Sequence, residues 1–255
     1  QAAAVGVTPR FFAMTTKGGV RPEQCQFRKQ RTTPMSVVSQ VLARGTLLDR
    51  FIDGLDRELE LPRVSFPDIH VTNSAEIEGA AEEARRVWRL GSGPVSSMMR
   101  VVENAGAVVS FFSGVSERVD ALSIDRTRPM IIRSEAKPAA VRLRFDLAHE
   151  CGHLIMHRGI ETGDKATESQ ANRFASAFLL PRSSFIHEFP RGRLLNWQAI
   201  YAMKLRWKVS AAAIIRRAYD LGIISADQYR TGYIHLSKTG QKKMERHDDE
   251  IAAEE

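Results

Sequence analysis

The stretch FDLAHECGHLIMH, residues 145–157, contains the pattern His-Glu-x-x-His at positions 149–153. In a helix, residues four apart lie one turn apart on one face, so His149 and His153 can direct two imidazole nitrogens at one point. Two converging imidazoles suit a tetrahedral Zn²⁺ ion. Glu150 follows the first histidine and is therefore expected beside the metal, where a general base for zinc-activated water belongs. Apolar flanks and a glycine just past the end favour a helix.

A catalytic zinc site needs a third protein ligand, because such sites use three and leave one position for water. His157 continues the histidine series but lies eight residues past His149, which is about 12 Å along a helix axis. Side chains spread over that distance cannot all reach one ion at bond lengths near about 2 Å. We expect His157 either to contact a metal ligand without binding the metal itself or to act as a cation at the helix C-terminus. The third ligand must come from another element.

The segment KATESQANRFASAFLLP, residues 165–181, supplies the main candidate for that ligand. Its apolar residues recur at three-and-four spacing and a proline closes it, which predicts a helix. Glu168 lies near the start of this helix, and Asn172 follows one turn later on the same face. We predict that Glu168 is the third ligand and that Asn172 orients a ligand by hydrogen bonding. Glu161 and Asp164 are the alternatives, because a first-turn acid can also be a solvated partner of the helix dipole.

These two segments together resemble the ImmA/IrrE family of zinc metallo-endopeptidases. The shared residues are His-Glu-x-Gly-His-Leu-x-x-His from His149 and Glu-x-x-Ala-Asn-x-Phe-Ala-x-x-x-Leu-x-Pro from Glu168. The resemblance implies a zincin-like fold, bound Zn²⁺, Glu150 as catalytic base and Glu168 as third ligand. It also implies a protein substrate, of the kind of a transcriptional repressor. Cys151 stands where bulky aliphatic residues are commoner in the family, which leaves the ligands untouched.

Residues 11–240 also look like the longer family members, in which an XRE-type DNA-binding domain precedes the protease. No helix-turn-helix pattern precedes the protease segment here, and the chain starts at Gln1 rather than Met. The expectation is a fragment or processed form without that domain.

The composition is that of a globular protein, with 43% hydrophobic and 26% charged residues in 255. Two cysteines, Cys25 and Cys151, provide no disulfide framework, which fits a reducing cytoplasm. No apolar stretch approaches the length of a membrane span, so no membrane partner is expected. The sequence gives no indication of oligomeric state.

The predicted fold class is α+β: a zincin-like metalloprotease domain with a small sheet and active-site helices, followed by a helical module. Four regions are expected: a connecting and helical segment over 1–70, the metallopeptidase domain over 71–189, a basic helical module over 190–243 and a disordered acidic tail over 244–255. Strands are predicted at 107–112, 121–124 and 129–134. By resemblance, Met130, Ile131 and Ile132 are candidates for the edge strand that pairs with the substrate backbone, against the alternative of an ordinary interior strand.

The helical module is strongly basic, since residues 191–243 contain eleven Lys or Arg against Asp220 and Asp227, or 11 − 2 = +9. Two helices joined by a short turn resemble a helix-turn-helix, and Arg216 and Arg217 could contact phosphates. The alternative, which the sequence favours slightly, is a helical hairpin packed on the protease. The second helix begins with three alanines, unlike a recognition helix.

Two functions therefore follow from the sequence. The first is a zinc-dependent endopeptidase in which Glu150 takes a proton from water and passes it to the leaving amine. The second is a DNA-associated transcriptional regulator with a structural or sensory metal site. The presence of Glu150 favours the enzyme, because a structural site needs no base.

Overall fold

The computed structural model describes residues 8–9, 18–27, 35–112, 121–133, 139–160, 162–242 and 244–254. The strands are β1 (Cys25–Phe27), β2 (Val108–Phe111), β3 (Ala121–Ile124) and β4 (Met130–Arg133), and a 3₁₀ turn, η2 (Pro22–Gln24), precedes β1. The helices are α2 (Met35–Glu58), α3 (Ser74–Val87), α4 (Met98–Asn104), α5 (Ala140–Met156), α6 (Lys165–Leu179), α7 (Arg182–Glu188), α8 (Trp197–Trp207), α9 (Ala211–Asp220) and α10 (Ala226–Lys238).

The four strands form one mixed sheet in the order β1-β3-β4-β2. Strand β4 is parallel to β2 and antiparallel to β3, and β1 is antiparallel to β3. Successive side chains of a strand point to opposite faces. Met130 and Ile132 accordingly join the core beneath α2, whereas Ile131 joins the core that contains α5. Both faces of the sheet are covered, which explains why Met130, Ile131 and Ile132 of β4 are all apolar.

The position of β4 corrects one sequence prediction. Met130, Ile131 and Ile132 were candidates for an edge that receives substrate, with an ordinary interior strand as the alternative, but β4 lies between β3 and β2. Strand β4 pairs with β2 along one side and with β3 along the other, so neither of its sides is open to a substrate strand. Strand β4 is therefore an interior strand.

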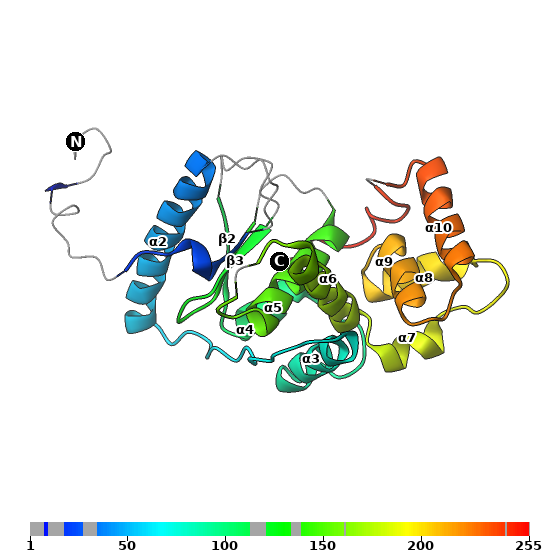
Figure 1. Ribbon diagram of the computed structural model, residues 1–255, viewed down its shortest axis with the longest axis horizontal. Helices are drawn as coiled ribbons and strands as arrows, with labels where there is room; N and C mark the ends of the chain where they lie inside the picture. Colours follow the sequence, from blue (N-terminus) through cyan, green and yellow to red (C-terminus); the bar gives the residue numbers. More distant parts are fainter. Residues whose placement is uncertain are drawn as a thin grey trace.

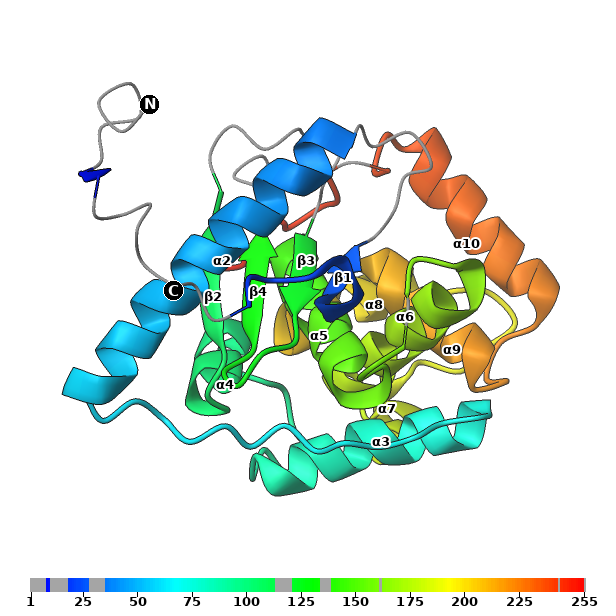
Figure 2. The same ribbon diagram turned by 60° about the vertical axis from the view of Figure 1, so that its left-hand side comes forward.

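Helix α2 covers one face of the sheet, as Figure 2 shows where the helix crosses in front of the strands. Val41 and Ile52 are its buried contacts with this face. Gly45 permits the close approach, because a Cβ there would lie 2.8 Å from Ile124 Cδ1. An internal glycine usually weakens a helix, but Gly45 is a packing position.

The opposite face of the sheet receives α5, and α6 packs on α5 (Figure 1). Gly152 allows this contact, because a Cβ at that position would lie 3.1 Å from Phe174 Cδ1. One continuous hydrophobic core then extends from α3 to α10. The predicted boundary between residues 189 and 190 therefore falls between helices that share a core.

The two helices predicted in the basic module are present as α8 and α9. Ser210 is the N-cap of α9, and its hydroxyl accepts from Ala213 N at 3.0 Å. Two of the module's cations are fully buried. Arg217 makes a bidentate bond to Glu78 at 2.6 and 2.7 Å, and Lys204 Nζ lies 2.8 Å from Glu245 Oε2. These contacts favour the interpretation of a module packed on the protease.

The last residues differ from the predicted disordered tail. Ile251 is buried, and Glu245 Oε2 accepts from the backbone N–H of Ala211 at 2.6 Å, at the start of α9. Glu254 pairs with the buried Arg144 of α5. The acidic composition of this segment suggests fraying, but its carboxylates meet cations buried elsewhere in the fold.

The architecture is α+β, as the sequence predicts, and is consistent with a zincin-like domain followed by helices. None of the described helices combines the length and apolar character that a membrane span requires.

Candidate metal centre

Helices α5 and α6 bring three potential ligands together. The Nε2 atoms of His149 and His153 lie 3.1 Å apart. Glu168 Oε2 lies 3.5 Å from His149 Nε2, and Glu168 Oε1 lies 3.4 Å from His153 Nε2. In a tetrahedral zinc site with bonds of about 2.0–2.1 Å, neighbouring ligand atoms lie about 3.3 Å apart. The three donors therefore already have the spacing of one face of such a site.

The hydrogen bond behind His149 determines which of its nitrogens is available. Asn172 Oδ1 lies 3.0 Å from His149 Nδ1 and can only accept, so His149 donates from Nδ1. The Nε2 atom then carries a lone pair. Asn172 thus has the position that the sequence predicts for an orienting partner.

A longer relay determines the tautomer of His153. Gln170 Oε1 lies 2.8 Å from His157 Nε2 and accepts its proton, so His157 Nδ1 is an acceptor. This Nδ1 lies 2.9 Å from His153 Nδ1, which therefore donates. The Nε2 atom of His153 is left with a lone pair directed at that of His149. Two lone pairs facing each other repel unless a cation lies between them, so the donor set fits a metal ion.

The electrostatics of the ligands also suit a cation. Burial lowers the pKa of His153 to about 4, so its imidazole is neutral at physiological pH and able to coordinate. Burial acts to raise the pKa of Glu168, but the two histidines beside it, His149 and His153, outweigh burial and hold that pKa well below its usual range. Glu168 is therefore an anion, as a carboxylate ligand of a cation must be.

Glu150 lies beside this group and is 3% exposed. Burial raises its pKa to about 7, against an opposing contribution from His149. The Ser123 hydroxyl favours the charged form, although neither Ser123 Oγ nor Glu150 Oε2 makes a hydrogen bond of standard geometry to a described residue. A carboxyl group in this setting exchanges its proton near neutral pH.

The remaining candidates are placed elsewhere. Asp164 caps α6, where its carboxylate accepts from Thr167 N at 2.7 Å, and it is not part of the cluster. Glu161 lies outside the described residues. Cys151 is packed in the hydrophobic core, and burial raises the pKa of its thiol well above the usual range, so it is no thiolate ligand.

Two residues near the site have no counterpart in the sequence predictions. Gln170 is separated from His157 by 13 positions, and Ser123 comes from β3, far from the metal motif. No local spacing pattern connects either residue to the histidines, so only the fold identifies them.

The comparison with family models gave a match to the segment that contains this site. Residues 102–219 match the family model Peptidase_M78, described as an IrrE N-terminal-like domain. The comparison with curated proteins gave no match. The matched segment includes both histidines, Glu150 and Glu168, and its family supports a metal-dependent peptidase. Residues 102–219 are therefore similar to the IrrE N-terminal-like domain of the Peptidase_M78 family, in agreement with the resemblance of the sequence to the ImmA/IrrE proteins.

Proposed function

We propose that the protein is a zinc-dependent endopeptidase that cleaves a protein substrate. The observation that carries this proposal is the convergence of two imidazole lone pairs and one carboxylate at the distances of a tetrahedral site. His149, His153 and Glu168 would hold the ion. A set of two histidines and one glutamate is a known catalytic zinc set that leaves a position for water.

When bound, zinc supplies a Lewis acid that makes water more acidic and polarises a carbonyl group. Glu150 accepts a proton from the attacking water and passes it to the leaving amine. A pKa of about 7 suits a group that must both take and give a proton near neutral pH. Asn172 and the pair formed by His157 and Gln170 hold the two imidazoles in the coordinating tautomer.

The substrate class rests on the family. By its resemblance to the ImmA/IrrE proteins, the enzyme would act on a transcriptional repressor or another DNA-binding regulator. Two free, buried cysteines support a reducing cytoplasm as its location.

The alternative of a DNA-associated regulator has less support. Arg217 and Lys204 of the basic module are buried in ion pairs, and Glu245 caps the N-terminal end of α9. A recognition helix uses that end to contact bases. We propose instead that residues 71–189 provide the catalytic groups and that the helices of 190–243 serve substrate recognition.

The test uses zinc-loaded protein and a peptide library made by digesting a bacterial proteome, with new termini identified by mass spectrometry. The native protein should generate new termini, and Glu150→Gln should retain zinc but lose cleavage by at least about 100-fold. Glu103→Gln, an exposed position on α4, is the matched control and should cleave normally. Cleavage by Glu150→Gln at the native rate would refute the assigned base. Salt-sensitive DNA binding with no cleavage by any form would favour the regulator.

A further inference from the structure

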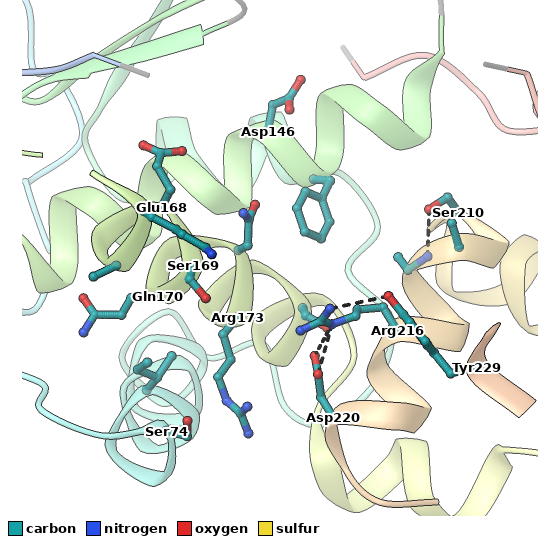
Figure 3. Close-up of a pocket in the computed structure, with 18 of the residues that line it drawn as sticks. Ser74, Asp146, Glu168, Ser169, Gln170, Arg173, Ser210, Arg216, Asp220 and Tyr229 are labelled. Atoms are coloured by element: carbon teal, nitrogen blue, oxygen red, sulfur yellow. Dashed lines mark hydrogen bonds and ion pairs between the residues drawn. The ribbon is translucent and has the colours of Figure 1, made fainter. Parts of the chain in front are cut away.

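A cleft of about 940 Å³ begins at the candidate metal centre and extends to the C-terminal helices. Figure 3 shows Glu168 and Asp146 at one end of it, and Arg216, Asp220 and Tyr229 at the other. Glu168 and Asn172 belong to the metal centre and also line the cleft. A substrate bound in this space would therefore be continuous with the reacting group.

The far wall of the cleft is apolar and aromatic. In the first turn of α9, Ala212 and Ala213 offer only methyl groups and so leave room for a ligand side chain. Helix α10 contributes Tyr229 and Tyr233, whose rings lie 4.8 Å apart. Tyr233 is 39% exposed, and Phe145 of α5 belongs to the same lining. Partly exposed aromatic rings next to small residues form a surface for a bulky apolar side chain.

The three arginines that line the cleft are already engaged, and one of them, Arg142, donates to the backbone carbonyl of Lys242 at 3.1 Å. Arg216 lies 3.0 Å from Asp220 and 3.4 Å from the Tyr229 hydroxyl (Figure 3). Arg173 lies 3.3 Å from Glu78. A phosphate or a nucleic acid would have to compete with these carboxylates for the guanidinium groups. The part of the cleft next to Arg173 and Arg216 therefore favours an apolar ligand over an anionic one; Lys165, which also lines the cleft, is on α6, the helix that contains Glu168.

We propose that this cleft binds the substrate polypeptide on one side of the scissile bond and selects a bulky aromatic or aliphatic side chain. Helices α9 and α10 form the recognition wall, so the basic C-terminal module acts in substrate selection. The volume lies near the upper end of the range of about 300–1,000 Å³ for ligand sites, which is enough for a large side chain and adjacent backbone. This inference rests on the proposed peptidase function.

The test measures dissociation constants of zinc-loaded protein by titration calorimetry with three probes. Acetohydroxamate reaches only the metal, a hydroxamate-capped Gly-Gly dipeptide adds backbone, and the Phe-Phe counterpart adds bulky side chains. The native protein should bind the Phe-Phe probe at least about tenfold more tightly than the Gly-Gly probe, because one buried aromatic contact contributes on that scale. All three probes should bind.

Ala212→Trp fills the part of the cleft next to Ala212. It should remove the preference for the Phe-Phe probe over the Gly-Gly probe and leave acetohydroxamate binding unchanged. Tyr233→Ala is the second variant and should reduce the preference at least about threefold. Ala202→Trp is the matched control, since Ala202 is exposed on α8 and lines a separate hollow, and it should behave like the native protein.

The outcomes separate the two claims. If acetohydroxamate binds but the native protein does not distinguish the dipeptides, the cleft assignment is refuted and the metal centre stands. A preference that survives both Ala212→Trp and Tyr233→Ala also refutes it. If the zinc-loaded protein cannot be prepared or does not bind acetohydroxamate, the proposed function fails and this inference fails with it.

Discussion

The burial of Glu150 predicts a measurable cost to the stability of the metal-free protein. Its pKa rises from the ordinary value of 4.5 to about 7 in the folded state, chiefly through burial. Between these pH values the native protein retains a proton that the unfolded chain has released, so stability falls as pH rises. A difference of about 2.5 pKa units corresponds to about 3 kcal/mol, fully present above about pH 8.

Glu150→Gln removes this dependence, because glutamine is neutral throughout. The free energy of unfolding is measured with urea in chelator-treated protein. The difference between the variant and the native protein should shift in favour of the variant from pH 5 to pH 8. The expected gain is roughly 2.5 kcal/mol, since part of the cost is already present at pH 5. The substitution of an amide for the carboxyl group also changes stability by an amount that does not depend on pH, and this amount cancels when the two pH values are compared.

Glu103→Gln provides the control, because Glu103 is exposed on α4 and should show no such gain. A Glu150→Gln variant whose advantage is the same at both pH values would refute the argument. It would mean that Glu150 is solvated in the metal-free protein and that its environment does not tune it for proton transfer.

Three further variants test other contacts of the site and its scaffold. Gln170→Leu should weaken zinc binding about 10–100-fold in competition with a chelator, because the tautomer relay loses its terminal acceptor; an unchanged zinc affinity would contradict the relay. Glu78→Gln should lower the free energy of unfolding by about 3 kcal/mol, because Arg217 is left buried without its anion; a loss under about 1 kcal/mol would show that Arg217 finds another partner. Gly152→Leu should overpack against Phe174, destabilise the protein by at least about 1 kcal/mol and weaken zinc binding, whereas native affinity would show that α6 can move away freely.

The sequence predicted well what depends on local spacing. The positions of His149 and His153 on one helix face follow from the four-residue interval, and the apolar periodicity of α6 brings Glu168 into range. Local chemistry was sufficient in each case.

What the sequence could not predict depends on contacts between distant segments. Strand β4 is interior because it pairs with both β2 and β3, and no pattern within β4 reveals which neighbours it will have. The ordering of the tail depends on Lys204 and Arg144, cations buried elsewhere in the chain. The hydrogen bond between Gln170 and His157 likewise exists only because α6 lies against α5. The strand order, the ordered tail and this hydrogen bond all depend on contacts between segments that are distant in the sequence.

The central claim is that His149, His153 and Glu168 together bind zinc. The most direct measurement is the zinc content and affinity of the purified protein beside His149→Ala and Glu168→Ala. The account predicts about one zinc per chain in the native protein and loss or strong weakening of binding in both variants. Full retention of zinc in Glu168→Ala would contradict the ligand set, and absence of zinc from the reloaded native protein would contradict the metal centre itself.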